Sequence, residues 1–274
     1  MTGKVQQRWI LNHLALARHV VCVSAHTARE LATFTSEAIQ DVTIIPNGLN
    51  FPYSPASEEA VHHLRERLGL ATGEQYLLHI GGDHWYKNRA GVLRIFQSLS
   101  RLLRKTGAPM PRLVMAGQAL SQEMRDSIVT DGLAASVIEV PDPSNEDLRS
   151  LYTGAAALLF PSLQEGFGWP LIEAQGCGCP VITSNRPPMT EVAGDAALYI
   201  DPAEESAAAT LIAASLDRLH LLRDAGFRNI QRFNTERIAE SYERFFAAAA
   251  YGTTSQAVPG IAHPEPAAKQ QGAP

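Results

Sequence analysis

Short apolar runs alternate with amphipathic helical patterns along most of this chain, and this alternation is the strongest constraint on its fold. A strand, a helix and another strand in that order are typical of βαβ units, which build a parallel sheet with helices on both faces. In the second part of the chain, strands are predicted over residues 76–80, 112–116, 137–140, 157–161, 180–183 and 197–200. Helices are predicted between and after them, including one capped by Ser144 with Asp147 and a last one over residues 204–222. The pattern therefore predicts the α/β class, with one complete doubly wound, Rossmann-like parallel-sheet domain.

The first fifty residues predict only two strands, over residues 20–24 and 42–45. Two strands are too few for a second complete domain, so we expect residues 1–50 to be the remnant of one, ending in a hinge. A linker with two prolines then leads into the complete domain, which we place at residues 51–250. Residues 251–274 are rich in proline and glycine and lack a periodic apolar pattern, which predicts a disordered tail.

Charge and cysteine content exclude several classes of function. The net charge of -5 gives no general attraction to nucleic acid, so we expect no nucleic-acid partner. Three cysteines cannot build a disulfide framework and are too few to hold a structural zinc ion, which favours buried, reduced thiols in the cytoplasm. No apolar run approaches the ~20 residues that a membrane-spanning helix needs.

The loop after the strand over residues 76–80 contains the first candidate site. In an open α/β sheet, ligands bind beyond the carboxyl ends of the strands. Gly81 and Gly82 allow the backbone to approach a phosphate closely, and Lys87 adds a positive charge at the start of the next helix. The alternative is a glycine turn with a solvated lysine, because the loop matches neither a Walker A motif nor a Gly-x-Gly-x-x-Gly fingerprint.

The loop after Pro161 contains the second candidate site. Pro170 suits the first turn of a helix, whose positive end attracts anions. Glu165 and Glu173 flank this helix start, and two carboxylates beside a bound anion favour a functional role. A pair of surface-exposed glutamates is the alternative.

The stretch from Glu165 to Glu173 resembles the signature of retaining glycosyltransferases, two glutamates separated by seven residues. More narrowly, it resembles glycosyltransferase family 4, whose GT-B fold consists of two facing Rossmann-like domains. Residues 45–48, 113–117 and 191–202 resemble, in order, the interdomain connection of that family, a mid-domain strand and the segment after the signature. The resemblance extends over about residues 20–246.

This resemblance implies that residues 51–250 bind a nucleoside-diphosphate sugar. Lys87 and Glu165 would be the catalytic residues, Lys87 by holding the diphosphate and Glu165 by contacting the transferred sugar. Glu173 would bind the ribose hydroxyls of the donor. The other donor-binding residues would be Gly81, Gly82, Pro141, Asp142, Gly166, Phe167, Gly168 and Trp169, with Pro141 and Asp142 in the loop that contacts the base.

The implied chemistry is the transfer of a hexose, with retained configuration, to a glycan or lipid-linked acceptor. The resemblance implies no cofactor and no metal, and the absence of an Asp-x-Asp motif from the sequence agrees with a metal-free reaction. The expected location is the cytoplasm, with peripheral binding at the inner membrane face where the acceptor is a lipid. Gly82 departs from the family, which usually has arginine there, and Arg89 or His84 are the candidates to compensate.

The first domain of the family carries a glycine-rich loop, an acceptor site and a histidine near the reacting sugar. His13, His19 and His26 do not lie in that context. Either the chain is truncated, or a partner chain supplies the missing domain. Three interpretations stay open: a glycosyltransferase seen mainly as its donor-binding domain, a non-catalytic nucleotide-sugar-binding subunit or fragment, and a sugar-nucleotide epimerase of the same fold.

Overall fold

The computed structural model describes residues 9–10, 13–34 and 42–251 of the chain. Its contacts divide the chain into two compact units. The larger unit runs from Leu49 to Asn234, and the smaller unit combines the residues up to Gly48 with those from Thr235 onward. The larger unit is therefore one continuous segment, whereas the smaller unit is assembled from two separate parts of the chain.

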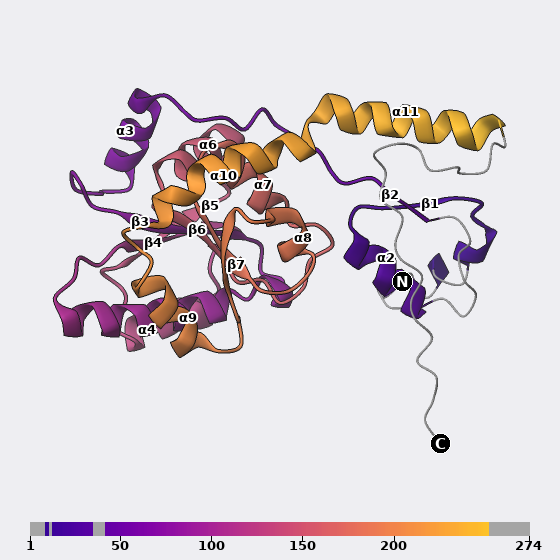
Figure 1. Ribbon diagram of the computed structural model, residues 1–274. Helices are drawn as coiled ribbons and strands as arrows, with labels where there is room; N and C mark the ends of the chain where they lie inside the picture. The colour runs from indigo at the N-terminus through magenta and orange to yellow at the C-terminus, as the bar shows by residue number, and fades with distance from the viewer. Residues whose placement is uncertain (1–8, 11–12, 35–41, 252–274) are drawn as a thin grey trace, which may run out of the picture. The chain divides into compact units, whose positions relative to one another are not determined.

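Six parallel strands form the sheet of the larger unit (Figure 1). They lie in the order β5-β4-β3-β6-β7-β8, so the chain moves outward from β3 to β5 and then crosses to β6 on the other side of β3. This is the strand order of a doubly wound sheet, and such sheets bind ligands where the order reverses, here between β3 and β6. The predicted α/β, Rossmann-like parallel sheet is confirmed. The strands are β3 (Tyr76–Gly81), β4 (Arg112–Gly117), β5 (Val137–Pro141), β6 (Ala157–Phe160), β7 (Val181–Ser184) and β8 (Ala197–Ile200).

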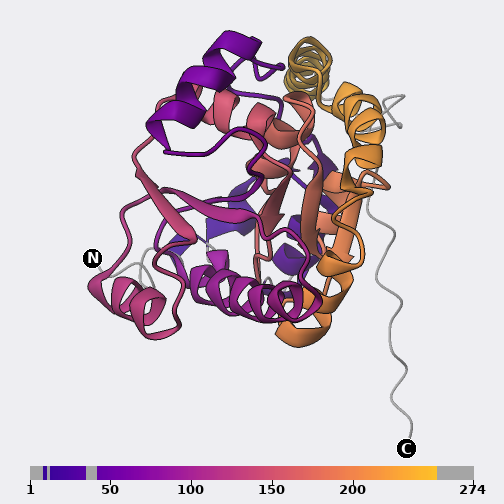
Figure 2. The ribbon, with the colours of Figure 1, turned by 90° about the vertical axis from the view of Figure 1, so that its left-hand side faces the viewer.

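Helices cover both faces of this sheet. Helices α4 and α9 pack together along one face, and α3 and α6 pack together along the opposite face (Figure 2). Strand residues such as Leu77, Leu113 and Leu159 are completely buried between these layers, which is why the strands appear in the sequence as continuous apolar runs. The helices are α3 (Glu58–Arg67), α4 (Arg89–Thr106), α5 (Gln122–Thr130), α6 (Asn145–Gly154), α7 (Trp169–Gly176), α8 (Met189–Ala193), α9 (Glu205–Ala213) and α10 (Leu222–Asn229).

Serine residues begin three of these helices. Ser57, Ser121 and Ser144 each accept a hydrogen bond from the main-chain N–H three residues ahead, which satisfies a donor that the first turn leaves unpaired. Ser144 Oγ accepts from Asp147 N at 3.1 Å and donates to Asp147 Oδ2 at 2.8 Å. The predicted cap of α6 is confirmed.

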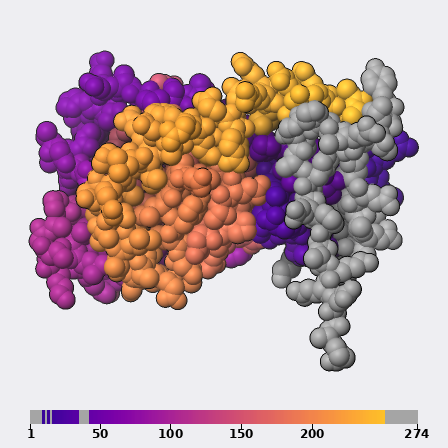
Figure 3. Space-filling view, viewed as in Figure 1, coloured from indigo at the N-terminus to yellow at the C-terminus, as the bar shows by residue number. Residues whose placement is uncertain are grey.

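The predicted continuous helix over residues 204–222 is wrong. Helix α9 ends at Ala213, and the chain continues through turns into the 3-10 helix η3 (Leu219–Leu221), then α10 and the 3-10 helix η4 (Ile230–Phe233). At the end of α9, the Ser215 hydroxyl donates to Leu211 O at 2.8 Å, and the Arg218 guanidinium donates to Ala214 O at 3.1 Å. Side chains thus satisfy carbonyls at the end of the helix. This C-terminal part of the larger unit is the orange surface in Figure 3.

The described part of the smaller unit contains two short parallel strands, β1 (Val20–Cys22) and β2 (Val42–Ile44). Their buried core consists of Cys22, Ala28 and Ile44. The other elements are the 3-10 helix η1 (Leu14–Leu16), α2 (Ala25–Phe34) and α11 (Thr235–Tyr251), where the ring of Phe245 lies edge-on to that of His19 at 6.0 Å.

The unit boundary between Gly48 and Leu49 lies close to the predicted boundary at residue 50. Helix α11, however, groups with the smaller unit and not with the domain that we expected to extend to residue 250. The predicted tail over residues 251–274 lies outside the described residues from residue 252 onward. The roles of the units as acceptor remnant and donor domain stay predictions.

Candidate active site

Direct hydrogen bonds connect the loops that follow β3 and β6. Leu163 N donates to Tyr86 O at 2.8 Å, and the side-chain amide of Asn88 donates to Pro161 O at 3.0 Å. Because β3 and β6 are parallel neighbours, their carboxyl ends meet at the same edge of the sheet. The structure therefore brings the two predicted loops together where the strand order reverses.

A largely buried ion pair joins these loops. Lys87 ends the 3-10 helix η2 (Trp85–Lys87), and its Nζ lies 2.7 Å from Glu165 Oε1. Only 14% of the Lys87 side chain and 9% of the Glu165 side chain are exposed. The Ser162 hydroxyl donates to the same Glu165 oxygen at 2.9 Å. The alternative of a solvated lysine in a glycine turn is therefore wrong.

Two aromatic rings also surround the Lys87 ammonium group. Its Nζ lies 5.5 Å from the centre of the Tyr86 ring and 5.0 Å from the centre of the Phe160 ring. Both distances fall within the range of cation–π attraction. A carboxylate and two rings from both loops thus fix the position of this cation.

Asn88 and Gly91 shape the turn into α4. Asn88 has a φ of 54°, in the left-handed region, where asparagine is better tolerated than most residues. A Cβ at Gly91 would lie 2.3 Å from Asn88 Oδ1, so only glycine lets the asparagine side chain occupy this space. Neither residue was predicted from the sequence, although an asparagine followed three positions later by glycine at a helix start is a usable signal.

Glu173 is a second buried carboxylate at this end of the sheet. It lies in α7, is 7% exposed, and accepts a hydrogen bond from the Tyr152 hydroxyl at its Oε2, at 2.7 Å. Burial raises the pKa of Glu173, while the hydrogen bond from Tyr152 and the charge of Lys87 act in the opposite direction. Since the Glu165 side chain is only 9% exposed and Glu173 is buried, the alternative of a surface-exposed pair is also wrong.

The loop before α7 is turned by glycine and anchored by a phenylalanine. Gly168 has a φ of +94°, which L side chains rarely adopt. Phe167 is buried, and its ring lies edge-on to Phe233 at 5.6 Å. Gly166 is exposed, Trp169 is 42% exposed, and Pro170 occupies the first turn of the helix. The positive end of α7 therefore lies at the same edge as Lys87.

Two close glycines bring the ends of β3 and β4 together. Gly81 pairs with Gly117, whose φ is +114°. A Cβ at Gly117 would lie 2.6 Å from Gly81 O, so the main chains approach too closely for any side chain there. Gly82 differs, because the nearest atom to a Cβ at this position, Gln118 Oε1, would lie 3.4 Å away, and the φ of Gly82 lies outside the left-handed region. Space alone does not require glycine at residue 82.

The two proposed substitutes for an arginine at residue 82 lie in different surroundings. Arg89 is 4% exposed, and its guanidinium donates to Gln118 O at 2.8 Å and to Ala119 O at 3.4 Å. His84 is exposed and stacks on Tyr86, with ring centres 5.3 Å apart. Arg89 thus holds the loop after β4.

Pro141 and Asp142 follow β5, on the far side of β4. Pro141 pairs with Gly117, and Asp142 N donates to Gly117 O at 2.8 Å. Asp142 has a φ of 45°, and both residues are exposed. The predicted site residues therefore come from the ends of β3, β5 and β6, at one edge of the sheet.

A buried histidine lies beneath these loops. His79 in β3 is completely buried, and its Nδ1 donates to Leu159 O at 3.0 Å. Burial lowers the pKa of His79 to about 4, and the charges of Arg89 and Lys87 act in the same direction. Its imidazole is therefore neutral at physiological pH and adds no charge to the site.

Cys22, Cys177 and Cys179 are all buried and form no disulfide. In residues 9–10, 13–34 and 42–251, no group of three or more His, Cys, Asp or Glu side chains is arranged to hold a metal ion. No helix in these ranges is both long enough and apolar enough to cross a membrane.

Curated relatives align with a large part of this chain. O-antigen chain mannosyltransferase B of Escherichia coli is 29% identical over 204 residues, which cover 73% of this chain and 52% of the relative. D-inositol 3-phosphate glycosyltransferase of Nocardia farcinica is 27% identical over 225 residues, which cover 79% of this chain and 49% of the relative. The chain thus spans about half the length of these relatives.

Solved structures support the fold assignment. HepE of Anabaena, in complex with UDP and glucose, superposes with a TM-score of 0.76 at 18% identity, covering 88% of this chain and 67% of that one. Sucrose-phosphate synthase of Thermosynechococcus elongatus superposes with a TM-score of 0.71 at 23% identity, covering 85% of this chain and 59% of that one. These structural neighbours are GT-B glycosyltransferases. Residues 61–228, which include both loops of the site, match the family model of glycosyl transferases group 1. The chain belongs to the glycosyl transferases group 1 family.

Proposed function

We propose that the larger unit binds a nucleoside-diphosphate sugar at this edge of its sheet, and that the protein uses the donor for retaining transfer of a hexose. The observation that carries the proposal is the largely buried Lys87–Glu165 ion pair between the loops after β3 and β6. Without donor, Glu165 holds the Lys87 ammonium group in place. A diphosphate offers Lys87 a more highly charged anion, and Glu165 then contacts the transferred sugar.

The surrounding residues supply the other contacts of such a donor. Glu173 accepts hydrogen bonds from the ribose hydroxyls, and the positive end of α7 stabilises the leaving diphosphate. Lys87 supports the same charge, so the reaction needs no metal in this proposal. The remaining donor-binding residues are Gly81, Gly82, Gly166, the main chain of Phe167, Gly168 and Trp169, and, at the base, Pro141 and Asp142.

The relatives support a sugar nucleotide as substrate. Their names describe mannosyltransferases and inositol-phosphate glycosyltransferases, and solved neighbours hold UDP together with glucose or GlcNAc. Within the group, we assign the chain to glycosyltransferase family 4 and its acceptor to the glycans or lipid-linked glycans. A partner chain or further sequence supplies the acceptor domain, and the enzyme works in the cytoplasm, at the inner membrane face when the acceptor is a lipid.

Calorimetric titration of the purified chain with UDP, GDP and ADP tests the donor site. We expect one of the three to bind selectively, and the Glu173→Gln variant to bind it about tenfold more weakly, because an amide is a weaker acceptor than a carboxylate. Glu146→Gln is the matched control, since Glu146 on α6 is 70% exposed, and it should bind like the wild type. Absence of binding to any of the three nucleotides would refute the proposal.

Gly82 favours a second candidate, a subunit that binds the nucleotide sugar without transferring it. The family usually supplies a cation at this position, and Arg89 is committed to main-chain carbonyls. We expect Gly82→Arg to raise the rate of donor turnover by about tenfold, because a second cation stabilises the leaving diphosphate. An assay with radiolabelled donor measures this rate.

Gly82→Gln is the control, because it adds a side chain without charge and should leave the rate of donor turnover unchanged. Equal rates for all three proteins would mean that residue 82 does not limit the chemistry.

A further inference from the structure

A pair of tyrosines with edge-on rings, Tyr152 and Tyr53, connects Glu173 with the segment that enters the larger unit. The Tyr152 side chain is completely buried and donates its hydroxyl proton to Glu173 Oε2 at 2.7 Å. Within the described part of the chain, Tyr152 is the residue that hydrogen-bonds this carboxylate. The orientation of the Glu173 carboxylate therefore depends on where Tyr152 lies.

Tyr53 fixes the ring of Tyr152. The two rings are edge-on, with centres 5.8 Å apart, and Tyr53 is 5% exposed. The Tyr53 hydroxyl donates to Asn145 Oδ1 at 3.2 Å. Because Asn145 and Tyr152 both belong to α6, Tyr53 is tied to the helix whose side chain it supports.

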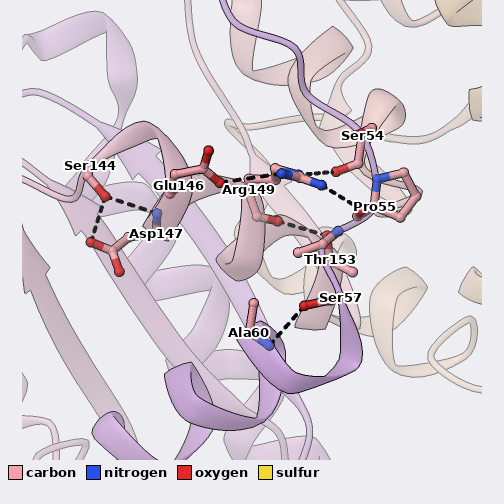
Figure 4. A network of polar contacts seen from close by, with 10 residues as sticks. Ser54, Pro55, Ser57, Ala60, Ser144, Glu146, Asp147, Arg149 and Thr153 are labelled. Carbon is pink, nitrogen blue, oxygen red and sulfur yellow. Dashed lines mark hydrogen bonds and ion pairs between the residues drawn. The ribbon is translucent and has the colours of Figure 1, made fainter.

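Side chains of α6 hydrogen-bond the main chain of the segment that follows Tyr53 (Figure 4). The Arg149 guanidinium donates to Ser54 O at 2.8 Å and to Pro55 O at 3.1 Å, and Ala56 N donates to Thr153 Oγ1 at 3.0 Å. On the other side, a Cβ at Gly176 would lie 2.8 Å from Tyr53 O. The segment therefore lies against both α6, which carries Tyr152, and α7, which carries Glu173.

We propose that Tyr152, supported by Tyr53, is the positioning residue that sets the Glu173 carboxylate for the ribose of the donor nucleotide. The inference rests on the proposed donor site. A carboxylate has about four lone-pair sites, so one bond from Tyr152 leaves acceptor capacity for both ribose hydroxyls. That bond also favours the ionised carboxylate against burial.

Removal of the hydroxyl in Tyr152→Phe should weaken binding of the nucleotide identified by titration about tenfold at pH 7. The pH profile should change as well. The groups that interact electrostatically with Glu173 are Tyr152, Lys87, Tyr53 and Cys177, and only Tyr152 and Lys87 lower its pKa. Loss of the Tyr152 bond therefore raises the pKa of Glu173 further, and binding should fail at a higher pH than in the wild type as the solution is acidified.

Tyr76→Phe is the matched control. Tyr76 is also completely buried, and its hydroxyl donates to a main-chain carbonyl, Leu151 O, at 2.7 Å. This variant loses a buried hydroxyl of the same kind without touching Glu173, so its affinity and pH profile should equal those of the wild type. Tyr53→Leu keeps the Tyr152 hydroxyl but removes its aromatic support, and should weaken binding about threefold. It serves as the test if Tyr152→Phe does not fold.

A 2′,3′-dideoxy analogue of the nucleotide identifies the contact. The wild type and Tyr152→Phe should bind this analogue equally weakly, since it lacks the hydroxyls that Glu173 accepts. If Tyr152→Phe lost the same factor in affinity for the nucleotide and for its dideoxy analogue, Tyr152 would not act through the ribose hydroxyls. An unchanged affinity of Tyr152→Phe for the nucleotide would equally overturn the positioning role, and both results would leave the donor site intact. A wild type that binds no nucleotide at all would instead refute the donor site, and this inference with it.

Discussion

Replacement of Lys87 by methionine should both weaken nucleotide binding and destabilise the larger unit. The variant removes the cation that we assign to the diphosphate, so affinity should fall on the order of 10²-fold. It also leaves the carboxylate of Glu165, 9% exposed, with the Ser162 hydroxyl as its one side-chain partner among the described residues. Breaking a buried pair in this way should lower the free energy of unfolding by about 3 kcal/mol. Calorimetry and urea unfolding measure the two effects.

A double variant separates binding from stability. Lys87→Met with Glu165→Gln should recover most of the lost free energy of unfolding, because no buried charge remains unpaired, while nucleotide binding stays weak. Lys105→Met, at an exposed position of α4, is the control and should change stability by no more than about 0.5 kcal/mol. If Lys87→Met unfolds like Lys105→Met, the ion pair does not stabilise the fold; if it binds nucleotide like the wild type, Lys87 is not the diphosphate ligand.

Gly117→Ala is expected to be the most destabilising single substitution considered for the sheet. The new Cβ would lie 2.6 Å from Gly81 O, at a φ of +114° that L residues rarely adopt. Strain and overlap together should lower the free energy of unfolding by about 3 kcal/mol. Nucleotide binding should weaken as well, because Gly81 must move and it leads into the loop that carries Lys87. Urea unfolding and calorimetry report both effects.

Gly107→Ala isolates the contribution of the overlap. Gly107 also has a positive φ, +70°, but a Cβ there would meet no atom within 4 Å. This substitution should therefore show only the backbone strain, about 1 kcal/mol, and should leave nucleotide binding unchanged. If both alanine variants lose the same free energy of unfolding, then β3 and β4 can move apart at Gly117 without a measurable loss of stability.

The sheet was predictable because its strands are buried on both faces. Runs such as residues 112–116 and 157–161 therefore contain little except apolar side chains, and their order along the chain fixes a parallel sheet. The Ser144 cap was predictable because it depends on a neighbour three residues away. The two site loops were found because each directly follows such a strand.

Features that depend on distant residues could not be found in this way. Tyr152 fits an ordinary helical pattern in α6, and its bond to Glu173 exists only because α6 and α7 pack together. Arg89 was considered as a cation for the site, but the carbonyls of Gln118 and Ala119 come from another strand's loop. The end of α9 at Ala213 was missed because residues 204–222 keep a helical apolar pattern through the break.

The division of the chain into units has a consequence for biosynthesis. The smaller unit includes α11, which begins at Thr235, after the whole of the larger unit. As the ribosome synthesises the protein, β1, α2 and β2 emerge before the larger unit, with a core of only Cys22, Ala28 and Ile44 among the described residues. The larger unit is complete before α11 appears, and domains generally fold as units during translation. The strands β1 and β2, which are translated before the larger unit, therefore belong to a unit that is completed after it.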